Sequence, residues 1–184
     1  MTVLVLGTPD SGKSQIAEEL AMKTGDEKRC YLATMKIMDE AGKKRVERHR
    51  QKREGKDFFT IEKEYGISEV PGQIEDPANT TVLLECVSNL VGNELFENPM
   101  RKDMLIPGPA KISHAERERF ADEVLGEIKV LAESVHHLIL VSNSFKAEGE
   151  TYDDQTRLYV QMMELVNQRL LAFADRIYDL RNEF

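Results

Sequence analysis

Residues 3–14 read Val-Leu-Val-Leu-Gly-Thr-Pro-Asp-Ser-Gly-Lys-Ser, and this stretch decides the fold. Its first four residues are a short apolar run, which predicts a buried strand of a parallel sheet. The other eight match the pattern G-x-x-x-x-G-K-[ST] in full, in which a glycine-rich loop turns its N–H groups toward phosphate oxygens. A helical pattern follows from Lys13 to about Thr24. Because a strand precedes the motif and a helix follows it, we expect a nucleotide site here.

Two side chains of this motif have predicted roles, and a third comes from another strand. We expect Lys13 to reach the β- and γ-phosphates and Ser14, at the start of the helix, to ligate Mg²⁺. Such a loop needs a carboxylate at the end of a second strand. Glu85 ends the apolar run 82–84 and is the candidate. The sequence therefore predicts a Mg²⁺ held through Ser14 and Glu85.

The rest of the chain alternates short apolar runs with helical patterns. Strands are predicted at 29–33, 58–61, 80–85, 137–141 and 176–180, and helices at 39–54, 88–96, 113–135 and 153–174. Residues 97–112 contain three prolines and no periodicity, which predicts a loop or a partly mobile connection. Alternating strands and helices predict a single α/β domain over residues 1–184, with a mostly parallel sheet flanked by helices as in P-loop NTPases.

Composition excludes several classes of protein. The 184 residues are 41% apolar and 32% charged, too apolar for a disordered chain and too charged for a membrane protein. The net charge of -8 argues against a protein that coats DNA non-specifically. Cys30 and Cys86 lack metal-ligand spacing, and no apolar run approaches the ~20 residues of a membrane span. We expect a cytoplasmic protein with reduced thiols and neither a secretion signal nor a membrane span.

Positive charge is concentrated in residues 43–56. This segment holds eight of the 25 basic residues and two acidic ones, so it carries +6 and the remainder carries -14. Five of these basic residues recur at helical spacing with His49, and the six are predicted to share one face: Arg45, Arg48, His49, Lys52, Arg53 and Lys56. Like charges at such spacing repel, so the face is better explained by an anion, either nucleic acid or the phosphates of a nucleotide.

His49 lies in the middle of this basic segment. Neighbouring cations would disfavour its protonated form, and a neutral imidazole can attack a phosphorus centre. A single histidine among arginines is more often structural, so the residues alone leave both roles open. His114, His136 and His137 show no chemical constellation in the sequence and are interpreted as structural.

Several stretches beyond the loop match one enzyme family in order and spacing. They are Ser11–Ser14, Tyr31–Thr34, Arg45–Arg50, Thr60–Glu62, Leu83–Cys86 and Val166–Leu170. Together they resemble the bifunctional adenosylcobinamide kinase / adenosylcobinamide-phosphate guanylyltransferase family of cobalamin biosynthesis. The loop is generic, whereas the His-Arg pair at this distance from it and the Leu-Leu-Glu-Cys strand are specific.

The resemblance implies two reactions on the corrinoid adenosylcobinamide. ATP or GTP phosphorylates its aminopropanol hydroxyl, and GMP then passes from GTP to the phosphate through a guanylylated histidine, with release of pyrophosphate. It also implies a homotrimer, with His49 and Lys13 as catalytic residues. The nucleotide-binding residues so implied are Gly7, Thr8, Pro9, Asp10, Ser11, Gly12, Lys13, Ser14, Thr34, Met35, Lys36, Arg50, Gln51, Lys52, Arg53, Glu62 and Glu85.

The chain departs from the family pattern at two places. Thr8 and Asp10 replace a glycine and an arginine, and the negative charge of Asp10 predicts weaker nucleotide binding. Residues 142–149, in the region expected to meet the corrinoid, keep only Asn143 and at most Gly149 of the family's usual residues.

Two alternatives remain at this stage. One is a P-loop small-molecule kinase without guanylyl transfer, in which His49 only binds phosphate. The other is a nucleotide-gated RNA-binding module that uses the basic face. The acidic remainder and the few aromatic residues near 43–56 argue against nucleic acid as a partner.

Overall fold

The computed structural model describes residues 1–37, 40–145 and 151–181, apart from the side chains of Arg45, His49 and Lys52. These residues form a six-stranded sheet in the order β3-β2-β4-β5-β1-β6, and all its neighbouring strands are parallel. The strands are β1 Thr2–Gly7, β2 Lys28–Ala33, β3 Phe58–Glu62, β4 Thr80–Glu85, β5 His137–Asn143 and β6 Arg176–Leu180. The predicted parallel α/β fold is confirmed.

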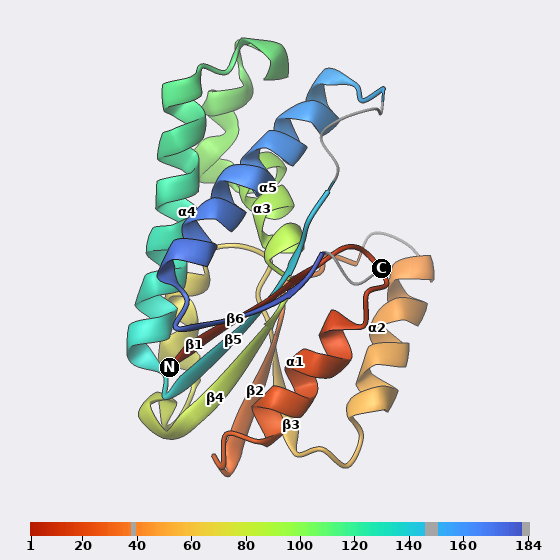
Figure 1. Ribbon diagram of the computed structural model, residues 1–184. Helices are drawn as coiled ribbons and strands as arrows, with labels where there is room; N and C mark the ends of the chain where they lie inside the picture. Colours follow the sequence, from red (N-terminus) through yellow and green to blue (C-terminus); the bar gives the residue numbers. More distant parts are fainter. Residues whose placement is uncertain (38–39, 146–150, 182–184) are drawn as a thin grey trace.

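Helices cover both faces of the sheet (Figure 1). They are α1 Lys13–Met22, α2 Glu40–Arg53, α3 Val87–Phe96, α4 His114–Ser134 and α5 Asp154–Phe173. Helices α3, α4 and α5 pack on one face, and α1 packs on the other. In the described part of the chain, no helix is long and apolar enough to cross a membrane.

The alternation of side chains along β1 explains these layers. Leu4 and Leu6 are fully buried in the core beneath α3, α4 and α5, while Val3 and Val5 pack with Ala17 of α1 on the opposite face. A central parallel strand is covered on both sides, so every position must be apolar, and the sequence accordingly reads as one continuous apolar run.

The connection predicted as a loop at 97–112 is more ordered than expected. It contains the 3-10 helices η3 Pro99–Leu105 and η4 Pro109–Lys111, each with a proline in its first turn. A guanidinium nitrogen of Arg101 in η3 lies 2.9 Å from a carboxylate oxygen of Glu94 in α3, and the same side chain pairs with Glu123 in α4. The connection is therefore fastened to the helices on either side of it.

Other 3-10 helices precede β4, namely η1 Ile67–Gln73 and η2 Pro77–Asn79. The predicted capping box is present at the start of α4, where the side chain of Ser113 and that of Glu116 bond to each other's backbone N–H. The prediction that Lys56 extends the basic face of α2 is wrong. The helix ends at Arg53, and the ammonium of Lys56 instead bonds Glu18 of α1 at 2.7 Å.

Candidate active site

A cleft of 660 Å³ opens where the carboxyl ends of the strands meet, which is the usual ligand crevice of an open parallel sheet. The loop after β1, the end of β2, one side of α2 and the end of β4 all contribute to it. Its lining consists of Pro9, Asp10, Gly12, Lys13, Ser14, Gln15, Tyr31, Ala33, Met35, Val46, Arg50, Arg53, Thr60, Glu62, Glu85, Cys86, Asn89, Val141 and Asn143.

The loop between β1 and α1 depends on two glycines. A Cβ on Gly7 would collide with the hydroxyl of Ser11 and lie 3.2 Å from Cβ of Leu180. Gly12 precedes α1 with φ at 79°, a left-handed conformation that favours glycine. Asp10 is also left-handed, with φ at 62°, and aspartate tolerates this region better than most residues. The loop therefore accepts an acidic side chain without changing its turn.

The side chain of Lys13 folds back onto the loop between β1 and α1. Its ammonium donates to the carbonyl of Thr8 at 2.9 Å, and only 7% of the residue is exposed. Burial lowers the pKa of Lys13, although the charges of Glu85 and Asp10 partly oppose this shift. Because the first turn of a helix also presents free N–H groups, this end of the cleft offers hydrogen-bond donors that suit a phosphate.

Glu85 links the loop to the neighbouring strands. Its Oε1 accepts a short hydrogen bond from Ser14, and its Oε2 accepts one from the hydroxyl of Tyr31 at 3.1 Å. Burial raises the pKa of Tyr31, so its hydroxyl stays protonated and donates. The hydroxyl of Ser14 and the carboxylate of Glu85 are hard oxygen ligands in direct contact, and this donor set fits Mg²⁺.

A buried cation faces the same cleft. The guanidinium of Arg53 lies 3.3 Å above the ring centroid of Tyr31, and the residue is 8% exposed. Its Nη1 is buried and has no hydrogen-bond partner among the described residues. Nearby, Nη2 of Arg50 lies 3.9 Å from Oε1 of Glu62. A buried guanidinium with a spare donor suits an anionic ligand.

The predicted basic face of α2 is divided between two surfaces. Arg50 and Arg53 line the cleft together with Val46, at helical spacing. Arg48 instead lines a separate surface groove with Lys43 and other residues of the helix. The basic residues that the sequence placed on one face of α2 therefore do not all line the cleft.

The structure brings most of the predicted nucleotide-binding residues together. Those that line the cleft are Pro9, Asp10, Gly12, Lys13, Ser14, Met35, Arg50, Arg53, Glu62 and Glu85. Gly7, Thr8 and Ser11 belong to the loop but do not line the cleft. The side chains of His49 and Lys52 lie outside the described part of the structure.

Three other predicted residues lie away from the cleft lining. Thr34 is fully buried, and its hydroxyl bonds both the N–H and the carbonyl of Cys86. Lys36 pairs with Glu97 at 2.6 Å, and the amide of Gln51 turns to Glu47 on the exposed side of α2. These contacts give Thr34 a structural position and leave the other two at the surface.

Sequence reasoning missed several cleft residues, including Tyr31, Asn89 and Asn143. Asn143 had a usable signal, because it is a polar residue at the carboxyl end of a buried parallel strand, in register with Gly7. Its amide donates to the hydroxyl of Ser88 at 2.5 Å. Tyr31 had no such signal, since a tyrosine inside a buried strand is ordinarily read as part of the core.

Known proteins resemble this chain over nearly its whole length. The model of the family described as cobinamide kinase / cobinamide phosphate guanyltransferase matches residues 3–181. The bifunctional adenosylcobalamin biosynthesis protein CobU of Escherichia coli K12 is 31% identical over 97% of this chain and 94% of that protein. The protein of the same name from Salmonella typhimurium LT2 is 29% identical over the same shares. The chain belongs to the cobinamide kinase / cobinamide phosphate guanyltransferase family.

Proposed function

We propose that this chain carries out both reactions of its family in cobalamin biosynthesis, phosphorylating adenosylcobinamide and then transferring GMP from GTP to the phosphorylated product. The observation that carries the proposal is the cleft, which joins a phosphate-binding loop, the Ser14–Glu85 contact and the buried guanidinium of Arg53. Each of these features suits a nucleoside triphosphate. The choice of cobinamide as the acceptor rests on membership of the family.

In the kinase reaction, the triphosphate lies across the N-terminus of α1. Lys13 binds the β- and γ-phosphates, and loop N–H groups bind the remaining oxygens. Mg²⁺, held by Ser14 and Glu85, neutralises phosphate charge when it is bound. The acceptor hydroxyl attacks the γ-phosphorus, the bond to the β-phosphate breaks, and the nucleoside diphosphate leaves.

In the transfer reaction, a ring nitrogen of His49 attacks the α-phosphorus of GTP. A P–N bond forms, the P–O bond to the β-phosphate breaks, and pyrophosphate leaves. A phosphate oxygen of the acceptor then displaces the imidazole and takes the GMP. The spacing of α2 supports this role, because position 49 lies three residues after Val46 and four before Arg53, and both of these line the cleft.

We also propose a homotrimer in the cytoplasm. Two apolar residues, Met100 and Ile106, are 91% and 76% exposed, which favours contact with another copy of the chain. Both cysteines are unpaired, as suits a reducing compartment.

A mass measurement tests the transfer step. The protein is incubated with Mg²⁺ and GTP, and its intact mass is measured under denaturing, non-acidic conditions. We expect an acid-labile adduct of one GMP in the natural chain, and none in His49→Ala. The matched control is His114→Ala, because this histidine side chain is 74% exposed on α4 and its removal should leave the adduct unchanged.

The other outcomes separate the alternatives. An adduct that persists in His49→Ala would remove the role of that histidine. Phosphorylation of adenosylcobinamide without any adduct would restrict the chain to the kinase reaction. Salt-dependent RNA binding without turnover would contradict both reactions.

A further inference from the structure

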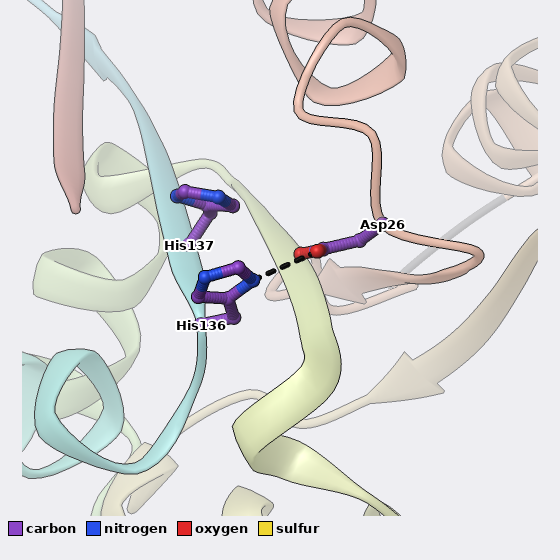
Figure 2. Close-up of side chains that lie close together, drawn as sticks. All are labelled: Asp26, His136 and His137. Atoms are coloured by element: carbon purple, nitrogen blue, oxygen red, sulfur yellow. Dashed lines mark hydrogen bonds and ion pairs between the residues drawn. The ribbon is translucent and has the colours of Figure 1, made fainter.

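A second group of chemically active side chains lies at the opposite end of the sheet from the cleft. Figure 2 shows Asp26, His136 and His137 close together, the aspartate reaching from the segment between α1 and β2 toward two histidines at the start of β5. One ligand atom from each residue lies within 4.8 Å of the other two. Nδ1 of His136 is 2.8 Å from Oδ1 of Asp26, and the two imidazole centroids are 4.1 Å apart.

Neighbouring groups hold these side chains in place. The second carboxylate oxygen of Asp26 accepts from the hydroxyl of Thr81 in β4 at 2.6 Å. The backbone N–H of His136 donates to the carbonyls of Pro77 and Thr80, and its own carbonyl accepts from the N-terminal ammonium at 2.9 Å. The bond from Thr81 is of the kind that fixes the orientation of metal ligands in proteins, and the backbone bonds fix the chain at His136.

His137 supplies an independent observation. Its Nδ1 is buried and has no hydrogen-bond partner among the described residues. Buried polar atoms in native proteins nearly always have a partner, so this nitrogen calls for a ligand. A metal ion between the three side chains would provide one.

We propose that Asp26, His136 and His137 bind a divalent transition-metal ion, with Zn²⁺ the best fit. Two imidazole nitrogens and one carboxylate oxygen suit Zn²⁺, Co²⁺ or Ni²⁺, whereas Mg²⁺ prefers oxygen ligands alone. Three protein ligands leave one position of a tetrahedral ion for water.

Side-chain movements of about 1 Å are needed to form the site. Two ligands ~2.1 Å from a tetrahedral Zn²⁺ are ~3.4 Å apart, so the contact between His136 and Asp26 must open by about 0.6 Å from its 2.8 Å, and a pair of ligand atoms at the 4.8 Å limit must close by about 1.4 Å. The side chain of His136 is 52% exposed and can move by this amount. The bound ion would join the entry to β2 with the start of β5, across β4, which lies between them.

Direct metal titration tests the proposal on the full-length chain without nucleotide. After chelator treatment and buffer exchange, Zn²⁺ is added in competition with a chromophoric chelator, and Co²⁺ is followed by its visible absorption. We expect one ion per chain, and a melting temperature raised by about 5–11 °C at a hundredfold excess over Kd.

Variants identify the ligands. His136→Ala and Asp26→Asn should each weaken Zn²⁺ binding at least tenfold and abolish the Co²⁺ spectrum. His114→Ala is the matched control, because this histidine lies 3.4 Å from Glu118 on α4 and is also exposed. Equal Zn²⁺ binding by the natural chain and a folded His136→Ala, or no binding by a folded natural chain, would overturn the proposal.

Discussion

Replacing Arg53 with lysine would keep a positive charge in the cleft but remove the planar group that lies 3.3 Å above the ring of Tyr31. In the nucleotide-free protein, the substitution removes one favourable and one unfavourable contribution to the free energy of unfolding. Stacking of a desolvated guanidinium contributes ~1–2 kcal/mol, whereas a buried donor without a partner costs ~1–3 kcal/mol. We therefore expect Arg53→Lys to change the free energy of unfolding of the nucleotide-free protein by no more than ~2 kcal/mol.

With GTP bound, the same substitution should be costly. A phosphate oxygen would accept from the buried Nη1 of Arg53, which has no other partner among the described residues. A hydrogen bond to a charged group contributes ~1.5–3 kcal/mol. Losing ~2 kcal/mol weakens GTP binding by a factor of ~30.

Thermal unfolding can measure this difference. At a GTP concentration one hundredfold above the Kd of the natural chain, bound nucleotide stabilises that chain by ~2.7 kcal/mol but Arg53→Lys by only ~0.9 kcal/mol. For a chain of this size, the GTP-induced rise in melting temperature should fall from roughly 5–11 °C to roughly 2–3 °C. Arg48→Lys is the matched control, since Arg48 lines a different groove of the same helix.

Two results would refute the reasoning. If Arg53→Lys keeps the full GTP-induced shift, the buried guanidinium does not contact the nucleotide. If the nucleotide-free variant melts far below the natural chain, the stacking on Tyr31 outweighs the unpaired donor, and Arg53 is chiefly structural.

Three further predictions concern the loop and the core. Asp10→Asn keeps a residue that tolerates the left-handed backbone but removes a negative charge near the phosphates, so calorimetry should show GTP binding ~3–10-fold tighter; unchanged or weaker binding would contradict the role of that charge. Burial lowers the pKa of Lys13 from its ordinary 10.5, and only the ammonium form binds phosphate. GTP affinity should therefore be constant below the lowered pKa and decline as pH rises through it, whereas a decline of equal size in Lys13→Arg would exclude Lys13 as its cause. Arg101→Met removes the cation paired with Glu94, whose side chain is 1% exposed, and should lower the free energy of unfolding in urea by ~3–5 kcal/mol; a loss under ~1 kcal/mol would mean that the hydrogen bonds from Gly66 and Asn98 satisfy Glu94.

Local pattern was enough to predict the elements of the sheet. The run at 80–85 was predicted as a strand and is one, because a strand buried on both faces carries its own signature in consecutive residues. The loop motif likewise placed Lys13 and Ser14 in a cleft, since its spacing reflects one local geometry. Glu85 could be paired with them because the carboxyl ends of parallel strands meet at one edge.

Tertiary relationships could not be predicted in this way. The spacing of charges along α2 does not reveal which side of the helix faces the sheet. That Arg53 lines the cleft while Arg48 lines a separate groove is therefore visible only in the packed structure. His136 was interpreted as structural because its partner Asp26 is 110 positions away in the sequence. The order of the 97–112 connection likewise comes from Arg101 and its distant carboxylates rather than from its prolines.

The position of β1 has a consequence for biosynthesis of the protein. The strand lies between β5 and β6, so Thr2 pairs with Leu138 and Val3 with Arg176. Because β1 precedes both of these strands in the chain, it has its full set of sheet neighbours only after residues 176–180 have been translated. Until then Leu4 and Leu6 lack the complete core that α5 helps to form, and the loop that follows lacks one of its neighbouring strands. Pairing over such sequence distances is slow, so the apolar run at 3–6 stays exposed during much of folding.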